Sequence, residues 1–257
     1  MISILNLVIM SDNDNEKYND MYECLVNLNK IYENHKSVKV KTFFLKFSDI
    51  KEDIKLEQNI LHIKGKESFI PGIIEKTLKG FQYFADDIKN YDYILRSNLS
   101  TIIDFRYLAT ELHKNPINFY GGGHKRNLQW TGGGIEDSTW FGTDYIEGTS
   151  IIFTPKSIKY ILDNIHLIRT NIIDDVAFAI FMREHAPNEK IQDIDDSRYA
   201  IVPCFIYNQN LYIRDLHNMV NNKFIFYRNK CCNNRQVDVI QMNIISDCII
   251  KREFKNC

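Results

Sequence analysis

Tyr91-Asp92-Tyr93-Ile94-Leu95-Arg96-Ser97-Asn98-Leu99-Ser100-Thr101 is the stretch that decides the fold. Its first part, 91–96, is apolar and aromatic, which predicts a strand in the middle of a sheet. Small polar residues follow where the strand should end, and the apolar periodicity of 102–113 predicts a helix. A buried strand that presents a polar loop at its carboxyl end is a common ligand site in α/β proteins. An ordinary polar turn between a strand and a helix is the alternative interpretation of this stretch.

Composition describes an ordinary globular chain. It has 257 residues, of which 44% are hydrophobic and 25% charged, enough apolar material for a full core. The formal net charge of −1 argues against bulk nucleic-acid binding, which needs a concentrated basic surface. The six cysteines form no CxxC pair and no Cys/His spacing typical of zinc sites, so we expect reduced thiols in a cytosolic compartment.

The amino terminus is apolar over residues 2–10 but lacks a basic leader and a small-residue cleavage site. This pattern predicts a first strand and not a signal peptide. No apolar run approaches the length of a membrane span, so we expect no membrane span and a cytoplasmic location.

Strand and helix patterns alternate along the first part of the chain. This alternation predicts a mixed, mostly parallel sheet flanked by helices, an α/β fold in a single domain. The expected strands are 2–10, 38–47, 59–63, 91–96, 118–120, 145–154, 199–207, 211–213 and 222–227, and the expected helices are 16–34, 72–87, 102–113, 155–164, 174–182 and 237–251. Residues 185–198 are polar and acidic and read as a loop.

Two glycine runs, 121–123 and 132–134, lie close together. Neither has the spacing of a P-loop or of a dinucleotide-binding fingerprint. We interpret 121–144 as a long surface loop, and loops of this length are usually functional or disordered. Its aromatic residues Trp130, Trp140 and Phe141 favour a binding lid over disorder.

An acidic pair, Asp174-Asp175, stands at the head of the apolar helix that begins here. Aspartates at a helix start can cap free N–H groups and suit the helix dipole. Capping is therefore an alternative to catalysis for this pair.

Three segments occur in a fixed order: the apolar strand with its polar loop (91–101), the strand and helix that begin Glu147-Gly148-Thr149-Ser150, and Asp174-Asp175-Val176. This order, covering roughly 70–185, resembles the fringe-like β1,3-glycosyltransferases with the GT-A fold, a Rossmann-like α/β fold. Thr77-Leu78-Lys79-Gly80 is similar to a leucine- and lysine-containing helix of that family. The segment 91–101 further resembles short transferase-like proteins of large DNA viruses, and the cytoplasm would then be that of the host.

The resemblance implies a hexosyltransferase-like enzyme that moves a sugar from a nucleotide sugar, such as a UDP-sugar, to a hydroxyl of a glycan or protein-linked acceptor. Asp175 matches the family's catalytic base, which would take the acceptor proton during an inverting displacement. Asp174 matches a family glutamate and would orient the base or cap the helix. Gly148 and Thr149 match positions beside the donor sugar.

The metal-binding position departs from the family. Where the family has three aspartates, this chain has Asn98, Leu99 and Ser100, and Mg²⁺ or Mn²⁺ prefers anionic oxygen ligands. Two unit charges about 4 Å apart at an effective dielectric of about 20 interact by roughly 4 kcal/mol, so cations could replace much of a metal's role. We therefore expect that no metal is required, with Mn²⁺ or Mg²⁺ left open. The candidate cations are Arg96, Arg228 and Lys230; a solvated basic turn is the alternative for the last two.

The remaining donor-site candidates are Ser97 in the polar loop and Ser11 and Asp12 after the first strand, where GT-A folds face the nucleobase and ribose. Helix N-capping is the alternative for Asp12. Trp130 and Trp140 could stack on an acceptor sugar, although core packing is the alternative for Trp140. The resemblance divides the single domain, 1–257, into a nucleotide-sugar-binding half, 1–115, and an acceptor-binding half, 116–257, with a closing C-terminal segment.

Two other functions are compatible with the sequence. One is a degenerate GT-A-like module that binds a nucleotide or glycan without turnover, which the missing acidic triplet favours. The other is a nucleotidyltransferase, which the absence of paired carboxylates in 91–101 weakens. The sugar, the acceptor and the linkage are not determined by the sequence.

Overall fold

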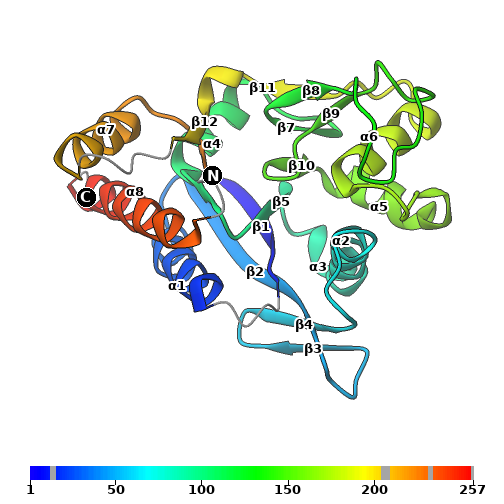
Figure 1. Ribbon diagram of the computed structural model, residues 1–257, viewed down its shortest axis with the longest axis horizontal. Coiled ribbons are helices and arrows are strands. Elements are labelled where there is room, and N and C mark those ends of the chain that lie inside the picture. The colour runs from blue at the N-terminus through cyan, green and yellow to red at the C-terminus, as the bar shows by residue number, and fades with distance from the viewer. Residues whose placement is uncertain (12–15, 204–208, 231–233, 256–257) are drawn as a thin grey trace.

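The computed structural model describes residues 1–11, 16–203, 209–230 and 234–255 (Figure 1). Among these residues the strands are β1 (Ile2–Ile9), β2 (Val38–Ser48), β3 (Ile54–Glu57), β4 (Ile60–Lys64), β5 (Tyr93–Asn98), β6 (Thr101–Ile103), β7 (Tyr120–Gly123), β8 (Lys125–Asn127), β9 (Asp144–Ile146), β10 (Ile151–Phe153), β11 (Gln192–Ile194), β12 (Tyr199–Val202) and β13 (Phe226–Asn229). The helices are α1 (Glu16–Lys30), α2 (Gly72–Tyr83), α3 (Ala85–Ile88), α4 (Phe105–Lys114), α5 (Pro155–Asp163), α6 (Asp174–His185), α7 (Gln209–Asn221) and α8 (Arg235–Lys255), with short 3-10 turns at Ile165–Leu167 and Asp196–Arg198.

Eight of the described strands form one sheet in the order β11-β7-β10-β5-β1-β2-β4-β3. The other five form a three-stranded sheet, β12-β13-β6, and a two-stranded sheet, β8-β9. The centre of the eight-stranded sheet is parallel: β1 pairs with β5 on one side and with β2 on the other, and β2 pairs with β4. Strand β10 runs antiparallel between β5 and β7. The expected fold class, an α/β fold with a mixed, mostly parallel sheet flanked by helices, is confirmed. Strands from 1–115 and from 116–257 share this sheet.

Helices cover both faces of the sheet, with α1, α4 and α8 on one side and α2, α5 and α6 on the other (Figure 1). Because side chains alternate along a strand, each central strand supplies both layers. In β1, Ile4 and Val8 enter the core beneath α1 and α8, whereas Leu5 and Leu7 enter the core beneath α2 and α6. The same alternation turns Arg96 of β5 toward α6.

The decisive stretch differs from the expectation at its end. Strand β5 continues through Asn98, and 101–103 forms strand β6, which pairs with β13 far along the chain. Helix α4 begins only at Phe105, after Asp104 accepts a hydrogen bond from the Tyr107 N–H as its N-cap. The predicted helix start at residue 102 was wrong because the long-range pairing with β13 overrides the local apolar periodicity.

The predicted loop 121–144 was also partly wrong, because it contains strand β8 and most of β7. The first glycine run lies within β7, between β10 and β11. A Cβ on Gly121 would lie 2.1 Å from the Gln192 carbonyl oxygen, and one on Gly122 would lie 2.0 Å from that of Ser150. These glycines therefore permit a close approach of backbones and do not form a phosphate-binding loop.

Several other boundaries differ from the sequence expectations. The segment 145–154 is two strands, β9 and β10, separated by a turn at 147–150, and the polar segment 185–198 contains β11. Residues 211–213 lie in helix α7 and not in a strand. The expected strand 199–207 ends at residue 202, and its residues 204–207 lie outside the described part. Most of the expected strand 222–227 precedes β13, whereas α8 extends beyond 237–251 at both ends.

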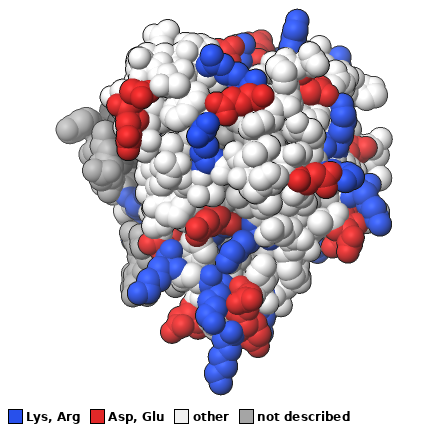
Figure 2. Space-filling model, turned by 90° about the vertical axis from the view of Figure 1, so that its right-hand side faces the viewer, with Lys and Arg blue, Asp and Glu red and all other residues white. Residues whose placement is uncertain are grey.

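Surface charge on the side of α5 and α6 is mixed in sign. Figure 2 shows lysines, arginines, aspartates and glutamates interspersed over that face. No helix of the described residues is long and apolar enough to cross a membrane.

Candidate functional site

Arg96 lies near the carboxyl end of β5 and is 3% exposed. Its guanidinium Nη2 lies 2.5 Å from an Asp174 carboxylate oxygen at the start of α6. Asp174 is also buried, so this is an ion pair shielded from water. A buried ion pair of this kind holds both groups in a defined geometry because separating them exposes an uncompensated charge to a low-dielectric interior.

Asp175 is the second residue of α6 and lies beside the turn at 147–150. Its Oδ2 accepts a hydrogen bond from the Gly148 N–H at 3.0 Å, and its Oδ1 accepts one from the Val176 N–H at 2.9 Å. A Cβ on Gly148 would lie 2.7 Å from Arg96 Nη1. Glycine at position 148 thus allows the turn to approach both Arg96 and Asp175. Asp175 therefore has two contacts. It accepts a hydrogen bond from a free N–H of the first turn of α6, and its other oxygen binds the turn at 147–150.

The acidic pair has an unusual protonation equilibrium. Burial and the neighbouring Asp174 charge raise the pKa of Asp175 from 3.8 to about 7, against the opposing effect of Arg96. Burial also raises the pKa of Asp174, and Arg96 opposes this. Because Arg96 contacts Asp174 directly, we assign the negative charge at neutral pH first to Asp174. Asp175 is then the carboxyl group that exchanges its proton near neutrality, which suits a general base.

This pKa has a consequence for stability. Between about pH 4 and pH 7 the folded state holds a proton on Asp175 that the unfolded chain has released, so this group's contribution to stability falls as the pH rises. We expect the free energy of unfolding of the wild type, relative to Asp175→Asn, to decrease by about 1 kcal/mol or more between pH 5 and pH 8. Urea titrations of both proteins across this range measure the difference. Parallel pH curves would contradict the raised pKa.

A second group gathers where β5 ends. The Arg228 Nη1 of β13 donates to the Asn98 side-chain oxygen at 2.9 Å and to the Ser100 hydroxyl at a very short distance. Thr101 also donates to the Asn98 oxygen, at 2.9 Å. Asn98 lies on the same face of β5 as Arg96, two residues and about 7 Å further along the strand. The structure thus brings the predicted residues Asn98, Ser100 and Arg228 together at the end of the strand whose Arg96 pairs with Asp174.

These residues do not fit a divalent cation. Asn98 and Ser100 offer neutral oxygens, and the positive Arg228 guanidinium lies directly on both of them. Among the described residues, no group of three or more His, Cys, Asp and Glu side chains could hold a metal ion. A guanidinium in this position supplies a fixed positive charge and several N–H donors for phosphate oxygens.

The turn at 147–150 connects further residues that sequence reasoning missed. The Thr149 hydroxyl lies 2.7 Å from the Tyr199 hydroxyl, which donates to Glu147 at 3.4 Å. The His124 ring stacks on Tyr199 with centroids 4.4 Å apart, and its Nε2 lies 3.4 Å from Glu147. Residue 124 has φ +61°, a backbone conformation uncommon for residues other than glycine. No local sequence signal joins these residues, because they meet only through the pairing of distant strands.

Lys76 of α2 is a further missed residue. It is 1% exposed, pairs with Glu67 at 2.8 Å and donates to the Met10 carbonyl oxygen at 2.8 Å. Its charge also lowers the pKa of Asp174. A lysine among the apolar positions of the helix 72–83 was the signal that could have revealed it. Ser11 follows Met10 directly and therefore lies close to the carboxyl end of β1, on which Lys76 is bound.

The other predicted residues are placed as follows. The Ser97 hydroxyl donates to the buried Asn6 side chain at 2.9 Å, on the opposite face of β5 from Arg96. Lys230 is exposed, just after β13. Asp12 lies outside the described residues.

The two predicted tryptophans lie in different places. Burial raises the pKa of Tyr145, and a hydrogen bond from Trp130, which is 37% exposed, opposes this rise. Tyr145 lies in β9, which contacts helix α6. The Trp140 Nε1 donates to Glu184 at 3.2 Å, near the far end of α6, and Arg169 packs over its ring. Because Glu184 is nine residues after Asp175, about 13 Å along the helix, the structure does not bring Trp140 to this group.

No protein-family model matches the sequence, and no curated protein matches it. Glycosyltransferases are among the solved structures that match this chain. One, from the virus PBCV-1, is involved in glycosylation of the major capsid; the match has 10% identity and a TM-score of 0.46, and covers 95% of this chain and 98% of that chain. The galactosyltransferase LgtC, solved with donor and acceptor sugar analogs, matches with 11% identity and a TM-score of 0.45, over 97% of this chain and 96% of that one.

A third similar structure is a Drosophila beta-1,4-galactosyltransferase 7 mutant in complex with manganese, UDP-Gal and xylobiose. It matches with 12% identity and a TM-score of 0.43, over 93% of this chain and 79% of that chain.

Proposed function

We propose that this protein is a glycosyltransferase that moves a sugar from a nucleotide sugar, a UDP-sugar in the first instance, to a hydroxyl acceptor on a glycan or a glycan-bearing protein. The observation that carries the proposal is that strand β5 contacts two groups near its carboxyl end: Arg96 pairs with Asp174, the neighbour of Asp175, and Asn98 accepts a hydrogen bond from Arg228. Asp175 is a buried carboxyl group with a pKa raised to about 7, and Arg228 is a cation fixed on the polar residues that end β5. A base and an anion-stabilising cation are what such a transfer requires.

The proposed mechanism is an inverting displacement. Asp175 takes the proton of the acceptor hydroxyl as that oxygen forms a bond to the anomeric carbon from the face opposite the leaving group. The bond between the anomeric carbon and the diphosphate oxygen breaks, and the nucleoside diphosphate leaves with the electron pair. The Gly148 N–H fixes the orientation of the Asp175 carboxylate, and Arg96 keeps Asp174 ionised beside it.

Arg228 stabilises the charge that develops on the leaving diphosphate, with Lys230 as a second, exposed cation in the same segment. In this proposal the enzyme needs no added metal. Asn98 and Ser100 have neutral side chains, and both already bind the Arg228 guanidinium. Exposed Trp130 offers an aromatic face for an acceptor sugar. In this proposal Thr149, whose hydroxyl is held by Tyr199, contacts the donor sugar.

Release of nucleoside diphosphate tests the proposal. The protein is incubated with a panel of UDP-, GDP- and TDP-sugars and candidate acceptors, each with EDTA and with Mn²⁺. We expect release from one donor class to survive EDTA. A requirement for Mn²⁺ would contradict the metal-independent mechanism, and absence of release with every donor would contradict the transferase.

Replacement of Arg228 tests the role of the cation. We expect Arg228→Gln to lower kcat/KM for the donor by about 10²-fold or more, because a charge-assisted bond to the leaving group is lost. Steady-state kinetics measure the loss, and Arg214→Gln in α7, an arginine with an exposed side chain, is the matched control. Equal kinetics for the two variants would remove Arg228 from the mechanism.

A binding module without turnover is the second candidate. It is favoured by the limited access to Asp175, which is 9% exposed and already accepts two backbone N–H hydrogen bonds. Such a module would bind UDP or a UDP-sugar in calorimetry, and would lose that binding in Arg228→Gln, but would release no diphosphate with any acceptor.

A further inference from the structure

A pocket of about 500 Å³ is lined by residues other than those of the candidate site. It is bordered by the segment 35–37 before β2, by helix α4 and by the segments that precede β12 and β13. The lining residues are His35, Lys36, Ser37, Arg106, Tyr107, Thr110, Glu111, Lys114, Arg198, Lys223, Ile225 and Glu253. Its volume is in the range of small-molecule sites.

The charge of this lining is strongly positive. Five of the residues are lysines or arginines and two are glutamates, in a chain whose net charge is −1. Lys36, Lys114 and Lys223 are exposed, and none of them pairs with a carboxylate in the described part of the chain. Several cations from separate segments that converge on one concave surface create a positive potential that attracts anions.

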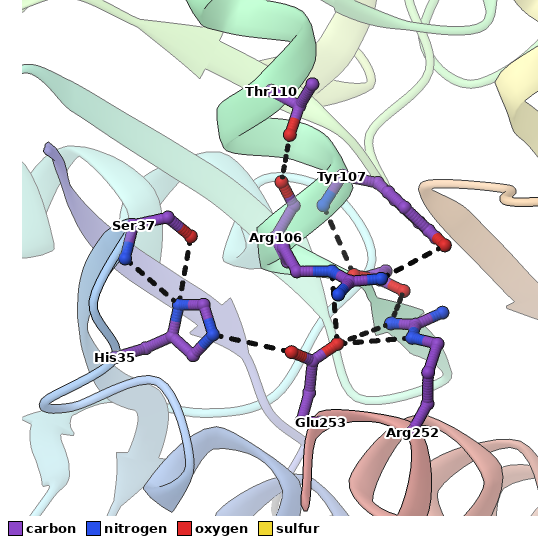
Figure 3. A network of polar contacts seen from close by, with 8 residues as sticks. His35, Ser37, Arg106, Tyr107, Thr110, Arg252 and Glu253 are labelled. Atoms are coloured by element: carbon purple, nitrogen blue, oxygen red, sulfur yellow. Dashed lines mark hydrogen bonds and ion pairs between the residues drawn. The ribbon is translucent and has the colours of Figure 1, made fainter. Parts of the chain in front are cut away.

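One of the two glutamates is already committed to cations of the protein. Glu253 of α8 is 6% exposed and lies 3.2 Å from Arg106 Nε, 2.9 Å from Arg252 and 3.4 Å from His35 Nε2 (Figure 3). The charge of Glu253 therefore offsets groups in the wall of the pocket. Glu253 does not pair with Lys36, Lys114 or Lys223, so these lysines can interact with a bound anion.

The same network fixes the Arg106 side chain. Its Nη2 donates to the Tyr107 hydroxyl at 3.1 Å, and its guanidinium carbon lies 4.9 Å from the centre of the Tyr107 ring (Figure 3). Within the described residues its Nη1 makes no hydrogen bond. A guanidinium that is already oriented loses little conformational entropy when it binds an anion.

The opposite wall is also ordered. Arg198 Nη1 donates to the Lys223 carbonyl oxygen at 3.2 Å, and the Ile225 N–H donates to the Arg198 carbonyl oxygen at 2.8 Å. Lys223 has φ +61°, a backbone conformation that a lysine rarely adopts and that only its surroundings impose. The turn that carries Lys223 is therefore held at the rim by one side-chain and one backbone hydrogen bond to Arg198.

We propose that this pocket binds a small molecule carrying two or more phosphate charges. Phosphate is the anion that several lysines and arginines with nearby hydroxyls of Ser37 and Thr110 suit best. The pocket is separate from the candidate active site. Ile225, which lines the pocket, directly precedes β13, and Arg228 of the candidate site is the third residue of that strand.

Titration of the ¹⁵N-labelled full chain with inorganic pyrophosphate tests the proposal. We expect saturable shifts of the Ser37, Thr110 and Lys223 amides, and weaker binding at higher ionic strength. Pyrophosphate can also bind at the proposed transferase site. Binding there would shift the Asn98 and Gly148 amides, so the two sites are distinguished by which amides move. The readout does not depend on turnover, so failure of one proposal leaves the other intact.

The double variant Lys36→Glu/Lys114→Glu tests the lining, since both side chains are exposed and the fold should persist. We expect its affinity at the pocket amides to fall at least about tenfold, equivalent to about 1.4 kcal/mol. The matched control is Lys51→Glu/Lys89→Glu, which makes the same charge change at exposed positions outside the pocket. Absence of shifts at the pocket amides, or an equal loss in both double variants, would overturn the proposal.

Two sources could supply the phosphates, a soluble metabolite or a phosphorylated lipid headgroup. Sedimentation with vesicles of phosphatidylcholine that contain or lack a phosphatidylinositol bisphosphate distinguishes them. Binding that needs the phosphorylated lipid and is lost in Lys36→Glu/Lys114→Glu supports a headgroup. Pyrophosphate binding at the pocket without vesicle binding supports a soluble ligand.

Discussion

Replacing Asp175 with Asn is expected to lower kcat for sugar transfer by about 10²- to 10⁴-fold, the range that general bases contribute. The amide has nearly the shape of the carboxylate, and its oxygen can still accept the Gly148 N–H hydrogen bond. It cannot take a proton from the acceptor hydroxyl. The loss should therefore fall on kcat, with the affinity for the donor nucleotide nearly unchanged, as measured by initial rates and by calorimetry with UDP.

The pH profile adds a readout that a structural role would not produce. Because the pKa of Asp175 is raised to about 7 and the base acts in its ionised form, wild-type activity should rise with pH through about pH 7. The residual activity of Asp175→Asn should lack this rise. Asp163→Asn, at an exposed aspartate at the end of α5, is the matched control and should behave as the wild type. A variant with full activity and an unchanged profile would exclude Asp175 as the base.

Replacing Arg96 with Met is expected to destabilise the fold by about 3–5 kcal/mol. The substitution keeps the apolar volume but leaves the buried Asp174 carboxylate without the cation that lies 2.5 Å away. Asp174 must then either carry an uncompensated charge in the interior or take up a proton. Urea or guanidinium titration measures the free energy of unfolding at pH 7.

Two further variants separate this effect from a simple loss of charge. Lys159→Met removes the cation of the exposed Lys159–Asp163 pair, and such a pair contributes only about 0–1 kcal/mol. Arg96→Met combined with Asp174→Asn removes both charges and should recover a large part of the stability. If Arg96→Met cost no more than Lys159→Met, the ion pair would not be a structural element of the site.

The two predictions concern one group with two different tasks. Arg96 and Asp174 fix the geometry at the end of β5, and their effect appears in stability. Asp175 carries the chemistry in the proposed mechanism, and its effect appears in turnover. A variant series that measures both quantities assigns each residue to its task.

The alternation of apolar strands and amphipathic helices was readable from the sequence because it depends on local periodicity. The first half of the sheet follows it closely, with strands at 2–9, 38–48 and 60–64 near their expected positions. The polar end of the 91–101 stretch and the acidic pair at the head of a helix were likewise visible as short motifs. These local features were enough to predict the fold class.

Local patterns failed where pairing partners lie far apart in the chain. The glycines at 121–123 were read as a loop, because no local signal shows that β10 and β11 pass on either side of them. The apolar periodicity predicts a helix from residue 102, although residues 102 and 103 lie in β6, whose partner strand lies more than 120 residues later. The resemblance stated from sequence motifs gave the site residues their order but not their contacts.

By itself, therefore, the sequence determined the layered α/β fold, the strand that ends in polar residues and the acidic helix start. Only the tertiary structure decided that Arg228 lies on Asn98 and Ser100, that Arg96 pairs with Asp174, that Lys76 contacts the end of β1 and that Tyr199 contacts Thr149. It also decided that five separate segments form a second, basic pocket. The reason is physical: periodicity reports which face of an element is buried, whereas charge pairing and close backbone approach depend on neighbours that only the folded chain supplies.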